Sequence, residues 1–316
     1  MFIFRLITNG LAPLTLIGAI LAYFMPEVFI IFGSIFKWLF AATMFALGVV
    51  LEPAELNDTL KHPKRIGLGV MTQFVLMPAL AFILVKTSNL PPALALGFII
   101  VGAAPGAMAS NVIVYLAGGA MAFSIAMTTV ATFLSPLITP SLVQALGGHL
   151  LPIPFWQMMQ TILLTVVLPL SLGMLLRRQL KTGLDVAKEV APAVAAIAIV
   201  IICSYAVAAN QARISQVGLE IFILVVLLNA LGYLGGWFLG KLYGFDQRHR
   251  LTLAIEIGMQ NAGMGVVLAL AHFKDTPETA LPGALFAVWC IITAAGATAY
   301  FRYRVTKSEH PRSFAT

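Results

Sequence analysis

Residues 253 to 266 read Leu-Ala-Ile-Glu-Ile-Gly-Met-Gln-Asn-Ala-Gly-Met-Gly-Val. This stretch places one carboxylate, Glu256, together with Gln260 and Asn261 in a segment that is otherwise apolar enough to cross a bilayer. Two glycines accompany the amides, and glycine lets a chain leave helical geometry. The stretch therefore predicts a membrane helix that is broken near its middle.

The composition is that of a polytopic membrane protein. Hydrophobic residues make up 60% of the 316 residues and charged residues only 10%, whereas charged residues make up about a quarter of soluble domains. The mean hydropathy is +0.97. Long apolar runs recur from one end to the other, so residues 1–316 are predicted to form a single membrane domain that is all α-helical. The net charge of +7 does not indicate a nucleic-acid partner, because the basic residues are confined to particular loops.

Apolar runs of roughly 17 to 25 residues predict about ten membrane spans. The predicted spans lie near residues 11–25, 28–51, 66–86, 92–117, 120–146, 155–176, 189–209, 217–243, 249–272 and 281–303. Fifteen lysines and arginines fall in one set of connections and three in the other. Because cytoplasmic loops carry the excess of basic residues, both termini are expected in the cytoplasm, with a basic tail over about 304–316. An even number of spans agrees with this orientation.

A second span also carries a break signal. Residues 102 to 106 read Gly-Ala-Ala-Pro-Gly in the fourth predicted span, and proline removes a backbone donor. The broken spans are the fourth of the first five and the fourth of the second five. Two five-helix halves, about 1–150 and 151–305, would lie upside down relative to one another, as in the inverted repeats of secondary transporters. Paired breaks in such repeats indicate a binding site near the membrane midplane.

Glu256 is the only acidic residue in the middle of a predicted span. A carboxylate at this depth costs about 3 kcal/mol or more unless it is neutralised, and no span has a lysine or arginine in its middle. A proton or a bound cation must therefore neutralise Glu256. Oxygen-bearing side chains are plentiful in the spans, and such hard ligands suit a cation such as sodium. These are Gln73, Ser110, Asn111, Ser124, Thr128, Gln260 and Asn261.

Two alternatives remain for these polar residues: they hydrogen-bond across helices as in other bundles, or Glu256 carries a proton.

The second halves of the broken helices would start near Ala107 and Asn261, where free amides and the helix dipole can hold an anion without arginine. Two sodium ions and one carboxylate leave about one positive charge, which a monoanionic substrate would cancel.

Over nearly its whole length the chain resembles the bile acid/sodium symporter family, particularly its bacterial members. The motifs that carry the resemblance are Met44-Phe45 with Gly48, Lys61-His62-Pro63, Gln73-Phe74, Met77-Pro78, Pro105-Gly106, residues 109–112, residues 256–261, residues 281–286 and Val288-Trp289. The resemblance implies ten transmembrane helices in the bacterial inner membrane. Helices 3–5 and 8–10 would form a core domain and helices 1, 2, 6 and 7 a panel domain, with helices 4 and 9 discontinuous and crossing.

The resemblance also implies two sodium sites, with sodium as the coupling ion and no other cofactor. Site one would use Ser110, Asn111, Ser124, Thr128 and Glu256. Site two would use Gln73, Glu256 and Gln260 with the carbonyls of Ile257 and Met259. Every side chain expected at these sites is present in the sequence.

The expected substrate-binding residues are Ala107, Met108, Asn261 and Cys290. Here the chain departs from its bacterial relatives, which have threonine where Met108 stands, His-Asn where Cys290-Ile291 stand, and histidine where Leu228 stands. Three polar functions are thus replaced by apolar ones around the expected cavity, so the cargo is expected to differ in size and polarity.

The sequence predicts a sodium-coupled symporter of a small organic anion that works by alternating access as a monomer among membrane lipids. A pantoate-like hydroxy or keto acid is the first choice of cargo, and a bile-acid-like amphipathic anion is the second. A proton-coupled organic anion transporter that uses Glu256 is the alternative. An intramembrane enzyme is a remote one, because no second catalytic carboxylate, membrane histidine or metal-ligand spacing accompanies Glu256.

Overall fold

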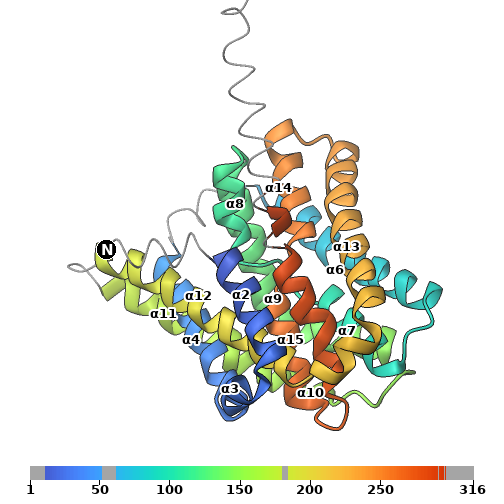
Figure 1. Ribbon diagram of the computed structural model, residues 1–316. Helices are drawn as coiled ribbons and strands as arrows, with labels where there is room; N and C mark the ends of the chain where they lie inside the picture. Colours follow the sequence, from blue (N-terminus) through green and yellow to red (C-terminus); the bar gives the residue numbers. More distant parts are fainter. Residues whose placement is uncertain (1–10, 52–61, 180–183, 291, 295, 297–316) are drawn as a thin grey trace, which may run out of the picture.

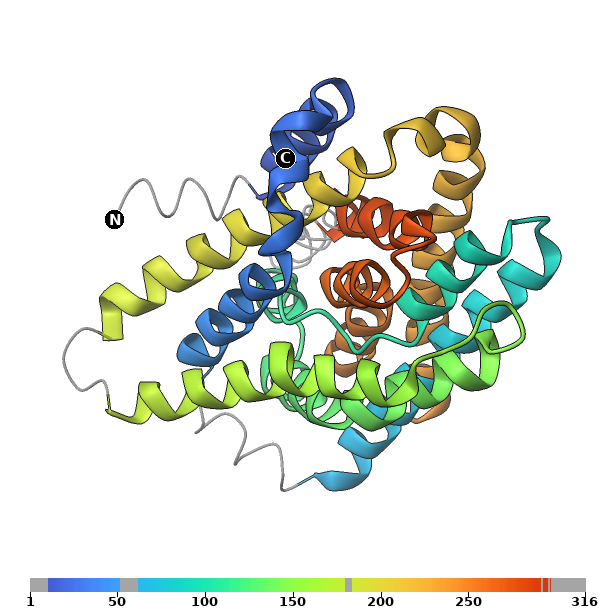
Figure 2. The same cartoon turned by 90° about the horizontal axis from the view of Figure 1, so that it is seen from below.

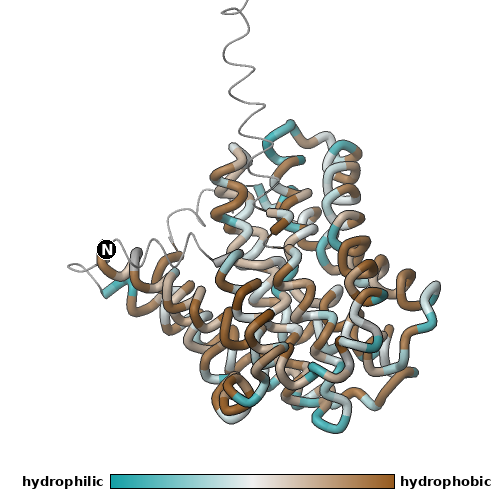
Figure 3. The backbone as a smooth tube through the Cα atoms, viewed as in Figure 1, coloured by the Kyte–Doolittle hydropathy of each residue, from teal (hydrophilic) through white to brown (hydrophobic). Residues whose placement is uncertain are grey.

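The computed structural model describes residues 11–51, 62–179, 184–290, 292–294 and 296. Within these ranges all regular structure is helical, and the single β-type contact is an isolated bridge between Gly106 and Gln260. Figure 1 shows the helices in chain order, and Figure 3 shows that hydrophobic residues cover most of the backbone while hydrophilic residues gather at helix ends and loops. This is the distribution expected of helices whose sides face lipid or one another.

The first half of the chain contains α2 (Leu11–Phe24), α3 (Pro26–Ile30), the 3₁₀ turn η1 (Ile31–Ser34), α4 (Phe36–Val50), α6 (Pro63–Thr87), α7 (Pro92–Gly102), α8 (Ser110–Leu116) and α9 (Met121–Gly147). The second half contains α10 (Phe155–Ile162), the π-helical turn η2 (Leu163–Val167), α11 (Leu168–Gln179), α12 (Leu184–Ala208), α13 (Gln211–Leu242), α14 (Gln247–Gly258), α15 (Ala262–His272) and the 3₁₀ turn η3 (Pro277–Ala280). Residues 281–290 are also helical.

A helix or a pair of helices lies at each predicted span. The last predicted span, 281–303, includes residues that lie outside the described ranges. Six helices in the described ranges are long and apolar enough to cross a membrane, or seven if the bent pair formed by residues 13–24 and 26–34 is one span. The halves of the broken spans are each too short to qualify. The predicted start of the second span at residue 28 was wrong: Pro26 starts a separate short helix, the chain bends by 113° there, and α4 begins only at Phe36.

On one side of the molecule α2, α4, α11 and α12 form a packed group, in which α12 packs against α2 and α4, and α11 packs against α4 (Figure 2). The backbones of α4 and α11 meet closely, since a Cβ on Gly48 would lie 2.2 Å from the carbonyl oxygen of Leu170 and one on Gly173 would lie 2.2 Å from that of Phe45. The buried Arg177 on α11 donates hydrogen bonds to the carbonyls of Val49 and Val50 at the end of α4. These contacts join the two helices tightly.

Helices α6, α7, α9, α13, α14 and α15 form the other group. Their contacts include α6 with α7, α9 and α13, and α14 with α9 and α13. The two broken helices, α7/α8 and α14/α15, lie within this group, and their breaks set the position of the polar site.

Candidate cation site at a paired helix break

The two broken helices meet at their breaks. The chain leaves helical geometry between Gly102 and Ser110 and again between Gly258 and Ala262. The amide of Ala107 donates to the carbonyl of Met259 at 2.8 Å, and the amide of Asn261 donates to the carbonyl of Pro105 at 2.8 Å. The two unwound segments therefore satisfy one another's backbone groups as a short antiparallel pair.

Side chains satisfy the carbonyls that the breaks leave free. Thr139 donates to the carbonyl of Ala103 at 2.8 Å, and Gln73 donates to that of Ala104 at 3.1 Å. Asn229 donates to the carbonyl of Gly258 at 2.8 Å. Because an unpaired backbone group inside a membrane costs several kcal/mol, these contacts let both breaks persist at this depth.

Glu256 lies on the last turn of α14 and is fully buried. Its Oε1 accepts hydrogen bonds from the hydroxyls of Ser110, at 2.5 Å, and Ser124, and its Oε2 accepts one from Thr128 at 3.1 Å. A Cβ at Gly106 would lie 2.9 Å from Oε2, so the glycine allows the break to approach the carboxylate. Among the residues that the structure describes, no basic side chain forms an ion pair with Glu256.

Asn111 completes this oxygen cluster. Its Oδ1 lies 2.7 Å from the hydroxyl of Ser124 and 3.3 Å from that of Thr128. Thr128 also donates to the carbonyl of Ser124 at 2.5 Å. Three hydroxyl protons thus face four acceptor oxygens, and each hydroxyl has only one proton to give. The cluster is rich in acceptors and suited to a cation.

A second group of amides lies beside it. Gln73 Nε2 donates to Gln260 Oε1 at 2.8 Å, and Gln260 Nε2 donates to the carbonyl of Ile257 at 2.7 Å. Gln73 Oε1 is buried and has no hydrogen-bond partner. The predicted carbonyl ligands already accept one hydrogen bond each, Ile257 from Gln260 and Met259 from the amide of Ala107, but a carbonyl oxygen has a second lone pair.

A cavity of about 350 Å³ adjoins the break. The four predicted substrate-binding residues, Ala107, Met108, Asn261 and Cys290, all line it. Leu228 does not line it and is buried in the apolar core. Ile291 is outside the described residues.

The opposite wall of the cavity was not predicted. It comes from α4, through Phe40, Met44 and Leu47, and from α12, through Pro192, Ala195, Ala196 and Ile199. In the sequence these residues look like any others in an apolar span, and only Pro192, inside α12, stands out. Three amide side chains line the cavity, Asn111, Gln260 and Asn261, and all belong to the breaks or to the turn that follows them.

The fold and the site together define a multi-pass helical membrane protein with a buried, oxygen-rich cluster at two paired helix breaks. The model of the sodium bile acid symporter family matches residues 38–220. The chain belongs to this family.

Its relatives are described as sodium-dependent transporters. It is 34% identical to the "Uncharacterized sodium-dependent transporter YocS" of Bacillus subtilis over 93% of this chain and 91% of that protein. It is 35% identical to the "Probable sodium/metabolite cotransporter BASS1, chloroplastic" of Arabidopsis thaliana over 78% of this chain and 61% of that protein. A rice relative, "Probable sodium/metabolite cotransporter BASS2, chloroplastic", is 27% identical over 95% of this chain and 71% of its own length.

Proposed function

We propose that the protein is a sodium-coupled symporter that carries a small organic anion across the plasma membrane by alternating access. The observation that carries the proposal is the fully buried Glu256, which the described residues supply with hydroxyl and amide oxygens but with no basic partner. A buried unpaired carboxylate is costly. Bound sodium neutralises it and uses the surrounding oxygens as ligands, whereas a proton needs none of them.

We propose two sodium sites, and the contacts around Glu256 support them. Site one takes Glu256 with Ser110, Asn111, Ser124 and Thr128, which already share hydrogen bonds. Site two takes Glu256 with Gln73, Gln260 and the carbonyls of Ile257 and Met259. The unpaired Oε1 of Gln73 supports the second site, because a buried carbonyl oxygen without a partner is an available ligand.

The proposed architecture is ten helices in two inverted repeats, with both termini in the cytoplasm. The panel is formed by the packed group of α2, α4, α11 and α12, and the core by the group that holds the two broken helices. The cavity supports this division, since α4 and α12 line one wall and the breaks line the other. In transport the core moves relative to the panel, and Glu256 can travel because sodium has neutralised it.

The cargo is a monoanion with an apolar body. The cavity is lined almost entirely by apolar side chains, while Asn111, Gln260 and Asn261 bring polar groups to one end of it. The helix α15 begins there, and Ala262 and Gly263 of its first turn line the cavity. The amides of Ala262 and Met264 already donate to Gln260 and Asn261, so the amide of Gly263 and the helix dipole are what favour an anionic group. A pantoate-like hydroxy or keto acid is the first choice, and a bile-acid-like anion is the second.

The proposal is tested with the purified full chain. A panel of organic anions of graded size is screened for thermal stabilisation in sodium and in potassium buffer, and the best anion is followed by uptake into proteoliposomes. Uptake that requires an inward sodium gradient supports the proposal. Uptake that follows a proton gradient in sodium-free buffer supports the proton-coupled alternative, and chemical turnover without uptake supports an enzyme.

The variant Met108→Thr tests where the anion binds. Met108 is buried and lines the cavity, and threonine adds a hydroxyl where bacterial relatives have one. More polar anions should gain stabilisation in this variant, while the sodium dependence stays as in the wild type. An unchanged ranking of anions would place the cargo elsewhere.

A further inference from the structure

A second cavity, lined in part by basic side chains, lies at the N-terminal ends of α6, α9 and α14, which the charge bias assigns to the cytoplasm. It has a volume of about 390 Å³. Four basic side chains line it. His62 and Arg65 lie at the start of α6, and Arg248 and His249 lie in the first turn of α14. The rest of the lining is the start of α9 and the residues just before it, from Gly119 to Phe123.

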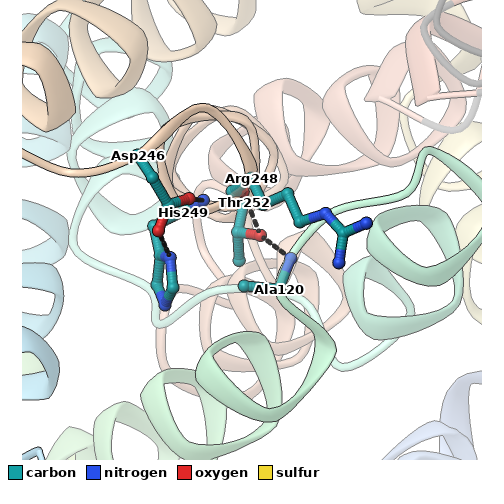
Figure 4. A network of polar contacts seen from close by, with 5 residues as sticks. All are labelled: Ala120, Asp246, Arg248, His249 and Thr252. Atoms are coloured by element: carbon teal, nitrogen blue, oxygen red, sulfur yellow. Dashed lines mark hydrogen bonds and ion pairs between the residues drawn. The ribbon is translucent and has the colours of Figure 1, made fainter. Parts of the chain in front are cut away.

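In the part of the chain that the structure describes, one acid, Asp246, pairs with a basic residue of this cavity, His249. No hydrogen bond or ion pair joins the side chains of Arg65 and Arg248 to other residues in the part of the chain that the structure describes. Asp246 accepts hydrogen bonds from the amide of His249 at 3.0 Å and pairs with its ring at 2.7 Å. Figure 4 shows the guanidinium of Arg248 extending away from this pair. The two arginines therefore remain available to an anion.

The start of α9 adds to the attraction. This helix is 27 residues long and begins after Ala120 without a side-chain cap. The amide of Ala120 donates to the hydroxyl of Thr252 at 2.8 Å (Figure 4). The amides of the first turn that follow have no acceptor within the helix, and the helix dipole is positive there. An anion held by the two arginines would meet these amides.

An apolar groove adjoins the basic cavity. It has a volume of about 500 Å³ and runs between one face of α6 and one face of α9, where Met71, Val75 and Leu134 are exposed. The two cavities meet at the first turn of α6, because His62 and Arg65 line the basic one while Pro63 and Ile66 line the apolar one.

We propose that the two cavities form one site for an anionic phospholipid of the cytoplasmic leaflet. The phosphate of the headgroup binds Arg65, Arg248 and the start of α9, and one acyl chain lies in the groove between α6 and α9. A soluble anion has no acyl chain to place in the groove. A zwitterionic lipid has no net negative charge, so its electrostatic attraction to the two arginines is weaker. This site is separate from the cation site and does not depend on the transport function.

The experiment measures lipid binding to the purified full chain in detergent, by native mass spectrometry and by thermal unfolding. Phosphatidylglycerol is compared with phosphatidylcholine of the same chains. Arg65→Gln and Arg248→Gln should each weaken phosphatidylglycerol binding about fivefold, because an interfacial arginine contributes about that factor. Arg178→Gln is the matched control, since Arg178 is an exposed arginine on α11, expected on the same membrane face. It should bind as the wild type does.

A second variant tests the groove. Gly67 lines it, and a Cβ there would meet no atom within 4 Å, so Gly67→Leu places a bulky side chain in the groove. It should weaken binding of long-chain phosphatidylglycerol and leave any binding of glycerol 3-phosphate unchanged. Equal affinity for phosphatidylglycerol and phosphatidylcholine, or a wild-type affinity in both arginine variants, would overturn the proposal. So would full competition by inorganic phosphate at the lipid concentration, because the cavity would then bind a free anion.

Discussion

Replacing Glu256 by glutamine removes the charge at the centre of the proposed ion sites and keeps the side-chain shape. Glu256 is fully buried among three hydroxyls that can also contact an amide. Two unit charges about 4 Å apart interact with roughly 4 kcal/mol at an effective dielectric constant of about 20. Loss of this attraction corresponds to a fall in sodium affinity of roughly a thousandfold. Since both proposed sites share Glu256, both should fail together.

Thermal unfolding in sodium and in potassium chloride measures this loss. Above its dissociation constant, each tenfold rise in sodium stabilises the wild type by about 1.4 kcal/mol per site. Two sites give a rise in Tm of several degrees, at about 2 to 4 °C per kcal/mol. Glu256→Gln should show almost none of this rise. In potassium it should melt at or above the wild type, because it buries no unpaired charge.

The control is Glu278→Gln, which makes the same chemical change in η3, away from the breaks. Its sodium response should equal that of the wild type. If Glu256→Gln is stabilised by sodium as much as the wild type, Glu256 is not a sodium ligand. If the wild type unfolds at the same temperature in sodium and in potassium chloride, no sodium-selective site is present. That result would favour the proton-coupled alternative.

Two predictions about packing and one about a hydrogen bond use the same unfolding measurement. Gly48→Ala should cost about 1 to 3 kcal/mol, because its Cβ would lie 2.2 Å from a backbone oxygen of α11. Gly67→Ala should be neutral or stabilising by up to about 1 kcal/mol, because nothing lies within 4 Å and alanine favours the helix; a loss equal to that of Gly48→Ala would contradict the packing argument. Thr252→Val should cost about 1 to 3 kcal/mol, because the amide of Ala120 loses its acceptor; an unchanged Tm would show that water replaces it.

The helices and the breaks could be predicted from the sequence because their signals are local. Apolar length defines a span, and Pro105 with the glycines around it interrupts one whatever packs nearby. The members of the oxygen cluster could also be named, since a polar side chain in an apolar span is conspicuous. Ser124 and Thr128 lie four residues apart on α9 and therefore share a helix face, and both meet Glu256.

What could not be predicted depends on contacts between distant segments. Thr139 is one hydroxyl among many in the sequence, and only the packing of α9 against α7 shows that it satisfies the carbonyl of Ala103. Asn229 is an amide within an apolar span, but its partner, the carbonyl of Gly258, is apparent only from the structure. The cavity wall from α4 and α12 consists of apolar residues that carry no local signal. The 113° bend between α2 and α3 likewise has only Pro26 as a local signal, and its angle is apparent only from the structure.

Residues 259–261 lie between the proposed ion sites and the proposed cargo cavity and contact both. Gln260 lines the cavity and accepts a hydrogen bond from Gln73, while Asn261 lines the cavity and caps α15 through its Oδ1. Met259 lines the cavity and holds the first break through its carbonyl. A cation coordinated by Gln260 or by the carbonyl of Met259 would therefore shift residues that also line the proposed cargo cavity. Such coupling is reciprocal. If sodium raises the affinity for the cargo anion by some factor, the cargo anion raises the affinity for sodium by the same factor.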